Sequence, residues 1–279
     1  MRGYMKLGEW NILKADHRTD AGMYLSDGEI AVLLPRKQVP EGLSSGQELR
    51  VFLYRDSEDR LIATVHEPLI ELGQMKRLKV KNVTDFGAFL DWGLERDVFL
   101  PHREMTAEVK PGKSYLVRMY LDKTGRLSVS MKLYGHLEPN TVYAKNSRVT
   151  GTVYERRKGF GAFVAIDDRY AGLIHESEIF DRIEVGDIVT CRIVNTREDG
   201  KTDLAMREEI PRQMEEDAEL LLRVIESYGG VLPFGEKADS DRIRKEFGIS
   251  KNAFKRAVGH LLKEGKVETG PTVIRLVRK

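Results

Sequence analysis

Two pairs of phenylalanines lie three residues apart around a glycine, Phe86 with Phe89 and Phe160 with Phe163. Exposed aromatic rings offer π-faces on which unpaired bases stack, each stack contributing about 1–3 kcal/mol with little dependence on base identity. Strict alternation would put residues three apart on opposite faces of a strand, but a bulge at Gly87 could bring both rings to one face. Phenylalanines in strands are usually core residues. The repetition of the same phrase favours a stacking surface instead.

Polar residues that suit the same ligand follow the first pair. His102 can stack on a base or donate a hydrogen bond, and Arg126 can hold a phosphate with a fork of N–H donors. The expected ligand is single-stranded RNA, because its bases can be splayed onto aromatic rings whereas duplex RNA hides them. The alternatives are packing or capping for the histidine and a solvated charge for the arginine.

The residue types that an enzyme needs are present, but not in catalytic patterns. The histidines show no HExxH pair, and the single cysteine, Cys191, leaves no cysteine set for zinc. The chain has no GxxxxGK[ST] phosphate loop and no GxSxG elbow. Cys191 lies in a predicted strand, Ile188–Val194, and is interpreted as a buried small hydrophobic residue. We expect no enzyme, no cofactor and no metal site.

Composition sets the broad class. The chain has 279 residues, 41% of them apolar, which is enough for two or more domains with real cores. It shows no apolar run of the ~20 residues that a membrane-spanning helix needs, and no signal peptide is recognised at the N-terminus. With one cysteine, we expect a cytoplasmic protein that makes no membrane contact. Net charge is only +2, but residues 244–279 carry ten basic and three acidic side chains, a weak indication of nucleic-acid binding.

An internal repeat predicts the architecture that must position these residues. Gly161 lies 74 residues after Gly87, and each glycine is followed by matching strand and turn phrases. A weaker copy lies at Ala21–Leu25, with Gly22 standing 65 residues before Gly87. Each copy has five short strands separated by turn residues, which is typical of a small antiparallel barrel. We predict barrels over residues 1–66, 67–134 and 144–210, with a linker at Leu133–Thr141.

The remaining residues, 213–279, have a different pattern. Helical spacing is present at Glu215–Tyr228, and a second helix is predicted to start at Ser240 as N-cap. A third helix, Lys251–Lys263, precedes two short strands, Lys266–Thr269 and Val273–Val277. This order predicts a winged helix, with Pro211 marking its boundary. The fold class is therefore multidomain and mainly β with an α/β tail: three tandem barrels followed by a winged-helix domain.

The phrase DFGAF…LPH…DKTGRLSVSMK resembles the S1 RNA-binding domain, a five-stranded OB-fold barrel. Three such barrels followed by a winged helix resemble the conserved virulence factor B family of bacterial RNA-binding regulators. The resemblance implies binding of single-stranded RNA and an influence on post-transcriptional gene expression, including virulence-factor production.

The resemblance also implies which residues face RNA. In the second unit they are Phe86, Phe89, His102, Asp122 and Arg126, and in the third Phe160, Phe163, His175, Arg197 and Lys201. In the first unit Ala21 replaces the first ring, and the matching residues are Tyr24, Arg36 and Arg60. Because one stacking ring is missing, we expect the first barrel to be the weakest RNA contact.

The third predicted helix carries a polar side that winged helices commonly place in a major groove. Its candidates for nucleic-acid contact are Asn252, Lys255, Arg256 and Lys263, extended on the wing by Arg275, Arg278 and Lys279. A solvated face and a protein-contact surface are the alternatives. The sequence therefore leaves two other functions open: a DNA-binding transcriptional regulator, and a ribosome- or polymerase-associated adaptor. We expect a monomer.

Overall fold

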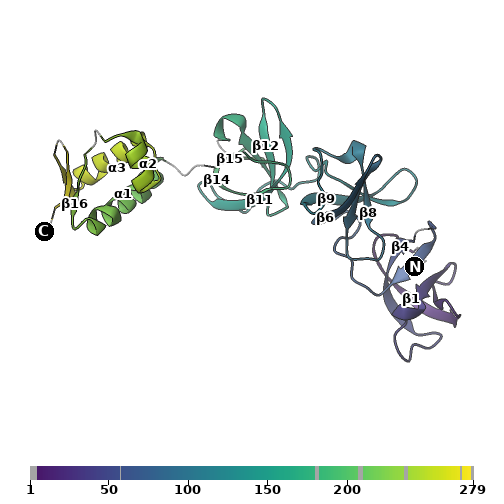
Figure 1. Ribbon diagram of the computed structural model, residues 1–279. Coiled ribbons are helices and arrows are strands. Elements are labelled where there is room, and N and C mark those ends of the chain that lie inside the picture. The colour runs from purple at the N-terminus through teal and green to yellow at the C-terminus, as the bar shows by residue number, and fades with distance from the viewer. Residues whose placement is uncertain are drawn as a thin grey trace. The chain divides into compact units, whose positions relative to one another are not determined.

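The computed structural model describes residues 5–56, 58–179, 182–206, 210–235, 238–270 and 272–277 (Figure 1). The chain divides into two compact units, Met1–Met206 and Arg207–Lys279. The first unit contains three closed five-stranded barrels and the second a winged helix, as the sequence predicts. Arg278 and Lys279 lie outside the described residues.

The three barrels share one topology. The first comprises β1 (Trp10–Arg18), β2 (Gly22–Ser26), β3 (Ala31–Pro35), β4 (Glu48–Arg55) and β5 (Leu61–Thr64). The second comprises β6 (Met75–Thr84), β7 (Gly87–Asp91), β8 (Val98–Pro101), β9 (Ser114–Leu121) and β10 (Leu127–Ser130). The third comprises β11 (Arg148–Arg157), β12 (Gly161–Ile166), β13 (Tyr170–His175), β14 (Ile188–Thr196) and β15 (Thr202–Ala205). In each, the third and fifth strands pair in parallel, which closes the barrel.

The repeated glycine begins the second strand of each barrel because another strand crosses it closely. A Cβ atom at Gly87 would lie 2.3 Å from the carbonyl oxygen of Leu100, and one at Gly161 would lie 2.0 Å from that of Ile174. No side chain fits at such distances, so the barrels require glycine where the strand starts. Close approach of the neighbouring backbone is therefore the reason for glycine at both positions.

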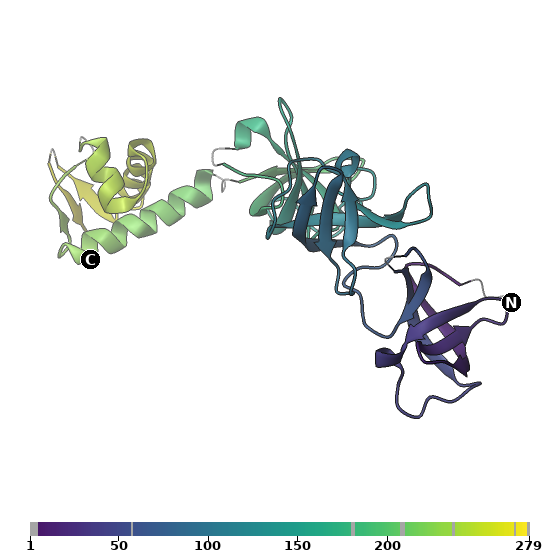
Figure 2. The same cartoon turned by 45° about the vertical axis from the view of Figure 1, so that its right-hand side comes forward.

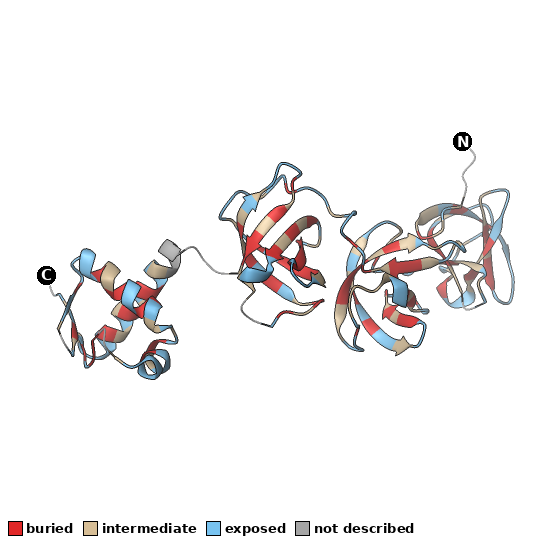
Figure 3. Cartoon of the chain, turned by 90° about the horizontal axis from the view of Figure 1, so that it is seen from above, coloured by how far each residue is buried: buried red, intermediate tan, exposed pale blue. Residues whose placement is uncertain are grey.

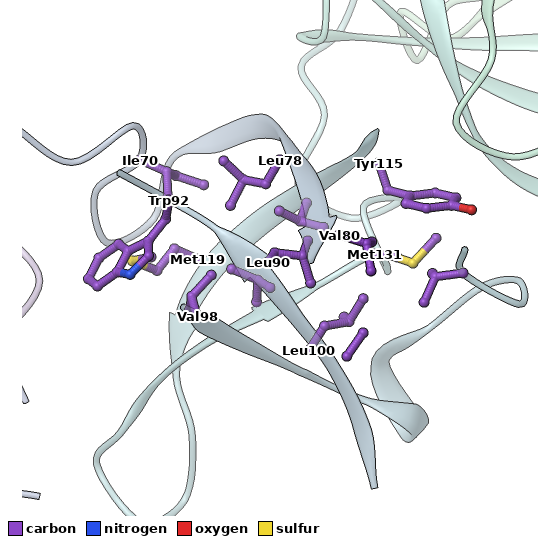
Figure 4. Packing of buried hydrophobic residues seen from close by; sticks show 14 of the residues in the cluster. Ile70, Leu78, Val80, Leu90, Trp92, Val98, Leu100, Tyr115, Met119 and Met131 are labelled. Carbon is purple, nitrogen blue, oxygen red and sulfur yellow. The ribbon is translucent and has the colours of Figure 1, made fainter. Parts of the chain in front are cut away.

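Buried and more exposed residues alternate along strands such as β6 and β14, whereas every residue of β12 is buried. Figure 3 shows the buried residues along the strands in red. The core of the second barrel extends beyond its own strands. Figure 4 shows part of it, from Ile70 and Trp92 at one end to Tyr115 and Met131 at the other. Phe52 of the first barrel is buried in the same cluster, so the first two barrels share apolar packing.

The predicted linker at Leu133–Thr141 is not a free tether. Leu133 is fully buried, and the Asn140 amide donates to the Tyr143 carbonyl and the Thr196 hydroxyl at 3.0 and 3.1 Å. An isolated bridge also joins Glu138 to Tyr170. Gly135 and Pro139 led to the prediction of a linker, but the segment packs because its apolar side chain Leu133 is buried.

The second unit contains α1 (Ile210–Ser227), β16 (Val231–Leu232), α2 (Ser240–Phe247), α3 (Lys251–Lys263), β17 (Val267–Thr269) and β18 (Ile274–Leu276). In Figure 2 the long helix α1 lies beside the shorter helices and the small sheet of this unit. The prediction of Ser240 as N-cap is wrong by one residue. Asp239 is the cap, its carboxylate accepting from the Asp241 amide at 3.1 Å, and Ser240 is the first helical residue.

Candidate nucleic-acid interface

Two phenylalanines project from the barrels at equivalent positions. Phe86 is 82% exposed and Phe160 is 62% exposed, each in the hairpin turn before the second strand of its barrel. The bulge expected at Gly87 is absent there; the register shift lies in the opposing strand, between Val80 and Asn82. The first ring is free because it belongs to the turn.

The second ring of each pair is less accessible. Phe89 is half-buried and packs on Phe99, with ring centroids 5.2 Å apart. Phe163 is only 8% exposed, because Tyr134 meets it edge-on at 5.8 Å and Arg157 lies 5.0 Å from its ring centroid. The expectation of Phe163 as an open stacking ring therefore disagrees with its burial. The exposed ring at this place belongs to Tyr134.

Tyr134 is the aromatic residue that sequence reasoning missed, because it was assigned to the linker. It is 47% exposed, and the Lys201 ammonium lies 5.2 Å from its ring centroid. A cation beside an exposed aromatic ring suits a stacked base with its phosphate. The sequence feature that indicated a packed segment was Leu133, the apolar residue before Tyr134, whose side chain is buried.

His102 and His175 do not occupy equivalent positions. His102 follows β8 and its Nε2 lies 3.2 Å from the Thr84 carbonyl oxygen, while its amide donates to the Phe86 carbonyl. In the third barrel the corresponding amide, the donor to the Phe160 carbonyl, is that of Glu176. His175 instead pairs with Gly161 on the strand. The prediction that the two histidines are equivalent is therefore wrong by one residue, because the pairing of the repeated glycine with the third strand of its barrel sets the register.

Arg36 fills the same place in the first barrel, since its amide donates to the Ala21 carbonyl at 2.9 Å. Its side chain is exposed. The other candidates of this barrel are engaged within it. Tyr24 is half-buried and stacks on His17 at 4.9 Å, and Arg60 pairs with Asp56 at 2.7 Å.

The last hairpin of each barrel repeats one hydrogen-bond pattern. The amide of Asp122 donates to the Arg126 carbonyl, as that of Arg197 does to Lys201, so these residues are equivalent. The Asp122 carboxylate accepts from the amides of Thr124 and Arg126, at 2.8 and 3.0 Å. Partial burial would raise the pKa of Asp122, but hydrogen bonds led by the Thr124 hydroxyl lower it overall. Asp122 thus shapes its own turn.

The two hairpin cations have different partners. Lys201 contacts Asp199 at 2.8 Å within its hairpin. Arg126 instead donates to Asp59 of the first barrel through Nε and Nη2, at 3.1 and 3.2 Å. These hydrogen bonds raise the pKa of Arg126, which stays charged.

In the third barrel Asp203 joins two of the predicted residues. Its carboxylate accepts from Arg197 Nη2 at 2.6 Å and lies 3.1 Å from His175 Nε2. Partial burial would raise the pKa of Asp203, but Arg197 and His175 outweigh it and hold the pKa below its usual value. Arg197 and His175 are thereby brought together on one side of the barrel.

In the second unit, the buried residues of α3 include Phe254 and Leu261, and its polar side is open. The candidates predicted there are all exposed: Asn252, Lys255, Arg256, Lys263 and, on β18, Arg275. This arrangement leaves a basic surface on the helix that a winged helix usually presents to a partner.

Among the described residues there is no group of three or more His, Cys, Asp or Glu side chains that could hold a metal ion. Within the same residues no helix is both long and apolar enough to cross a membrane. Cys191 is 3% exposed, and burial raises its pKa to about 12, as suits a structural thiol.

Comparison with known families covers most of the chain. The model described as S1 domain matches residues 7–66 and 72–132. The model for the second domain of virulence regulatory factor CvfB matches residues 136–208, and that of the CvfB-like winged helix domain matches residues 219–276. The matched families are nucleic-acid-binding domains.

Individual relatives agree with these matches. The chain is 34% identical to YitL of Bacillus subtilis (strain 168) over 276 residues, which is 94% of this chain and 91% of YitL. It is 30% identical to conserved virulence factor B of Staphylococcus epidermidis over 236 residues, or 81% of this chain and 79% of that protein. A crystal structure from Streptococcus pneumoniae, described as a multidomain protein with nucleic acid binding domains, has a TM-score of 0.54 at 23% identity. It covers 97% of this chain and 98% of its own, a similarity of fold.

Proposed function

This chain belongs to the conserved virulence factor B family, and we propose that it binds single-stranded RNA through its second and third barrels. The consequence proposed for the cell is post-transcriptional control of gene expression, including virulence-factor production. The protein would act in the cytoplasm as a monomer and carry out no catalysis.

The observation that supports this most is the paired exposure of Phe86 and Phe160. A large apolar ring left in water at one place needs no explanation, but two barrels expose one at the same turn. Each has a histidine or an arginine beside it: the His102 amide donates to the Phe86 carbonyl, and the Arg157 carbonyl accepts from the Phe160 amide. Exposed rings next to donors are the equipment for binding unpaired bases.

The geometry favours single strands over duplexes. A ring on a hairpin tip can insert beside a splayed base, whereas the stacked bases of a duplex offer no free face. Two such surfaces on one chain also raise the apparent affinity, because binding at one increases the effective concentration at the other. Modest affinity at each barrel is therefore sufficient.

The test is fluorescence anisotropy of the full chain with labelled single-stranded RNA and with duplex DNA, across a salt series. We expect Phe86→Ala and Phe160→Ala each to weaken RNA binding at least about fivefold, since a stacked base is lost. Ile188→Ala is the matched control, because it removes another exposed apolar side chain, 58% exposed, at the start of β14. Unchanged RNA affinity in the double phenylalanine variant would refute the proposal.

A second candidate function rests on the basic face of α3. Exposed Lys255 and Arg256 could instead place this helix in the major groove of DNA, making the chain a transcriptional regulator. Under this alternative, Lys255→Ala with Arg256→Ala abolishes duplex DNA binding, and RNA binding is weak throughout.

A further inference from the structure

The first and second barrels are joined by aromatic packing. Trp92 of the second barrel lies edge-on to Phe52 and Tyr54 of the first, with centroid distances of 5.9 and 6.1 Å. All three rings are almost fully buried. Contacts between the two barrels are therefore part of a core, and a surface that spans them has a defined shape.

A groove of about 510 Å³ lies along this junction. Its second-barrel side includes the rings of Phe86, Phe89 and Phe99, and its first-barrel side includes Tyr54, Arg55 and Asp59. The wall from the first barrel is the end of β4 and the hairpin that follows it. The stacking surface of the second barrel is thus one side of a groove.

The charges along the groove are nearly all occupied. Asp97 contacts Lys81 at 2.9 Å, and Asp122 accepts the amides of its own turn. Arg96 donates to the Asp56 carbonyl of the first barrel. A groove with aromatic sides and matched charges suits a neutral base better than a bare phosphate.

One ion pair in the groove, between Asp59 and Arg126, occupies the position where a ligand would bind. Asp59 meets the fork of Arg126 with both carboxylate oxygens, which is how a phosphate also meets an arginine. The two side chains are 41% and 58% exposed, so the pair is a surface ion pair of small net stability. Replacement of the Asp59 carboxylate by a phosphate at Arg126 therefore costs little free energy.

We infer that this groove is a composite site for one nucleotide of a single strand, whose base stacks on the Phe86–Phe89 side and whose phosphate displaces Asp59 from Arg126. The inference rests on the proposed function and deepens it. It gives the first barrel a role different from the one expected: the barrel acts through its β4–β5 hairpin, and its own face, with Tyr24 and Arg60 engaged, is secondary.

The test is Asp59→Asn in the full chain, with the same anisotropy measurement against single-stranded RNA. Removing the competing carboxylate is expected to tighten binding roughly threefold to fivefold, the scale of an exposed ion pair. The salt dependence is expected to steepen by about 0.7 in slope, because the phosphate of a single strand gains a free cation. In an Arg126→Ala background the gain disappears.

Glu58→Gln is the matched control. It removes the same charge from the same hairpin, but Glu58 contacts Arg60 at 2.7 Å and is not among the residues that line the groove. We expect its RNA affinity to change much less than that of Asp59→Asn.

Two outcomes overturn the inference. One is that Asp59→Asn binds no tighter than the wild type; the other is that Glu58→Gln tightens binding equally, which would reflect net charge alone. Failure of the proposed function is separate, because it appears as RNA affinity that the double variant Phe86→Ala with Phe160→Ala leaves unchanged. If Phe86→Ala weakens binding and Asp59→Asn does not strengthen it, only the composite site is refuted.

Discussion

Single side chains decide which ring of each barrel meets solvent. Phe163 keeps the residue type of Phe89, yet it lies under Tyr134, and the exposed face passes to the tyrosine. The Lys201 ammonium donates hydrogen bonds to the Asp199 carboxylate and to the Tyr134 hydroxyl oxygen. Both raise the pKa of Lys201, and Asp199 has the larger effect. A ring held between a neighbouring ring and a cation loses little freedom when a base stacks on it, so the site is partly preorganised.

We expect Tyr134→Ala to weaken single-stranded RNA binding about fivefold to tenfold, because a stacking ring is lost. Tyr134→Phe keeps the ring and should bind within about twofold of the wild type. Fluorescence anisotropy measures both. Tighter binding by Tyr134→Ala would mean that the tyrosine blocks a base position and does not provide one.

At the scale of elements, the start of each second strand carries the fold. Gly161 has a φ of 125° and lies against the Ile174 carbonyl, so both its conformation and its space require glycine. The hairpin turn that presents Phe160 depends on this crossing, since the Glu176 amide donates to the Phe160 carbonyl just beyond it. Fold and exposed ring are thus built from the same residues.

Gly161→Ala is expected to destabilise the third barrel by more than about 2 kcal/mol, through a backbone clash and a strained φ. Gly135→Ala is the control, because a Cβ atom there meets nothing within 4 Å and its φ is not positive. Thermal unfolding followed by circular dichroism distinguishes them. Equal melting temperatures for the two variants would contradict the argument.

The start of α2 offers a second test at this scale. Asp239→Ala removes the side chain that caps the helix and should cost about 1 kcal/mol of stability. Ser240→Ala lies one residue inside the helix and should change stability by less than about 0.5 kcal/mol. Urea denaturation of the two variants compares them, and a larger loss in Ser240→Ala would restore Ser240 as the cap.

At the scale of the whole first unit, the barrels are connected by polar contacts as well as by the shared core. Lys113 of the second barrel reaches Asp187 of the third at 2.8 Å. Partial burial opposes both charges, yet the pair lowers the pKa of Asp187 and raises that of Lys113. The contact therefore contributes fully above the unfolded pKa of an aspartate, ~4, and below that of a lysine, ~10.

As the pH falls through the lowered pKa of Asp187, this contribution should be lost. Without this ion pair the second and third barrels should move more independently of each other. Asp187→Asn is expected to have this effect at pH 7, measured by NMR as different rotational correlation times for the two barrels. Asp199→Asn is the control, because it breaks an ion pair within one barrel. Identical correlation times in the wild type and Asp187→Asn would show that the other contacts suffice.

The sequence alone determined the number and type of domains, because glycine positions, strand alternation and turn residues are local and repeat along the chain. It also identified Phe86, Phe160 and the basic face of α3, since a repeated phrase and a helical period are visible without coordinates. The tertiary structure decided what lies against what. Phe163 is buried under Tyr134, and Arg126 is paired with Asp59 of another barrel. Strand register places His175 one residue away from the position equivalent to that of His102. These are contacts between residues distant in the sequence, and their geometry exists only when the chain has folded.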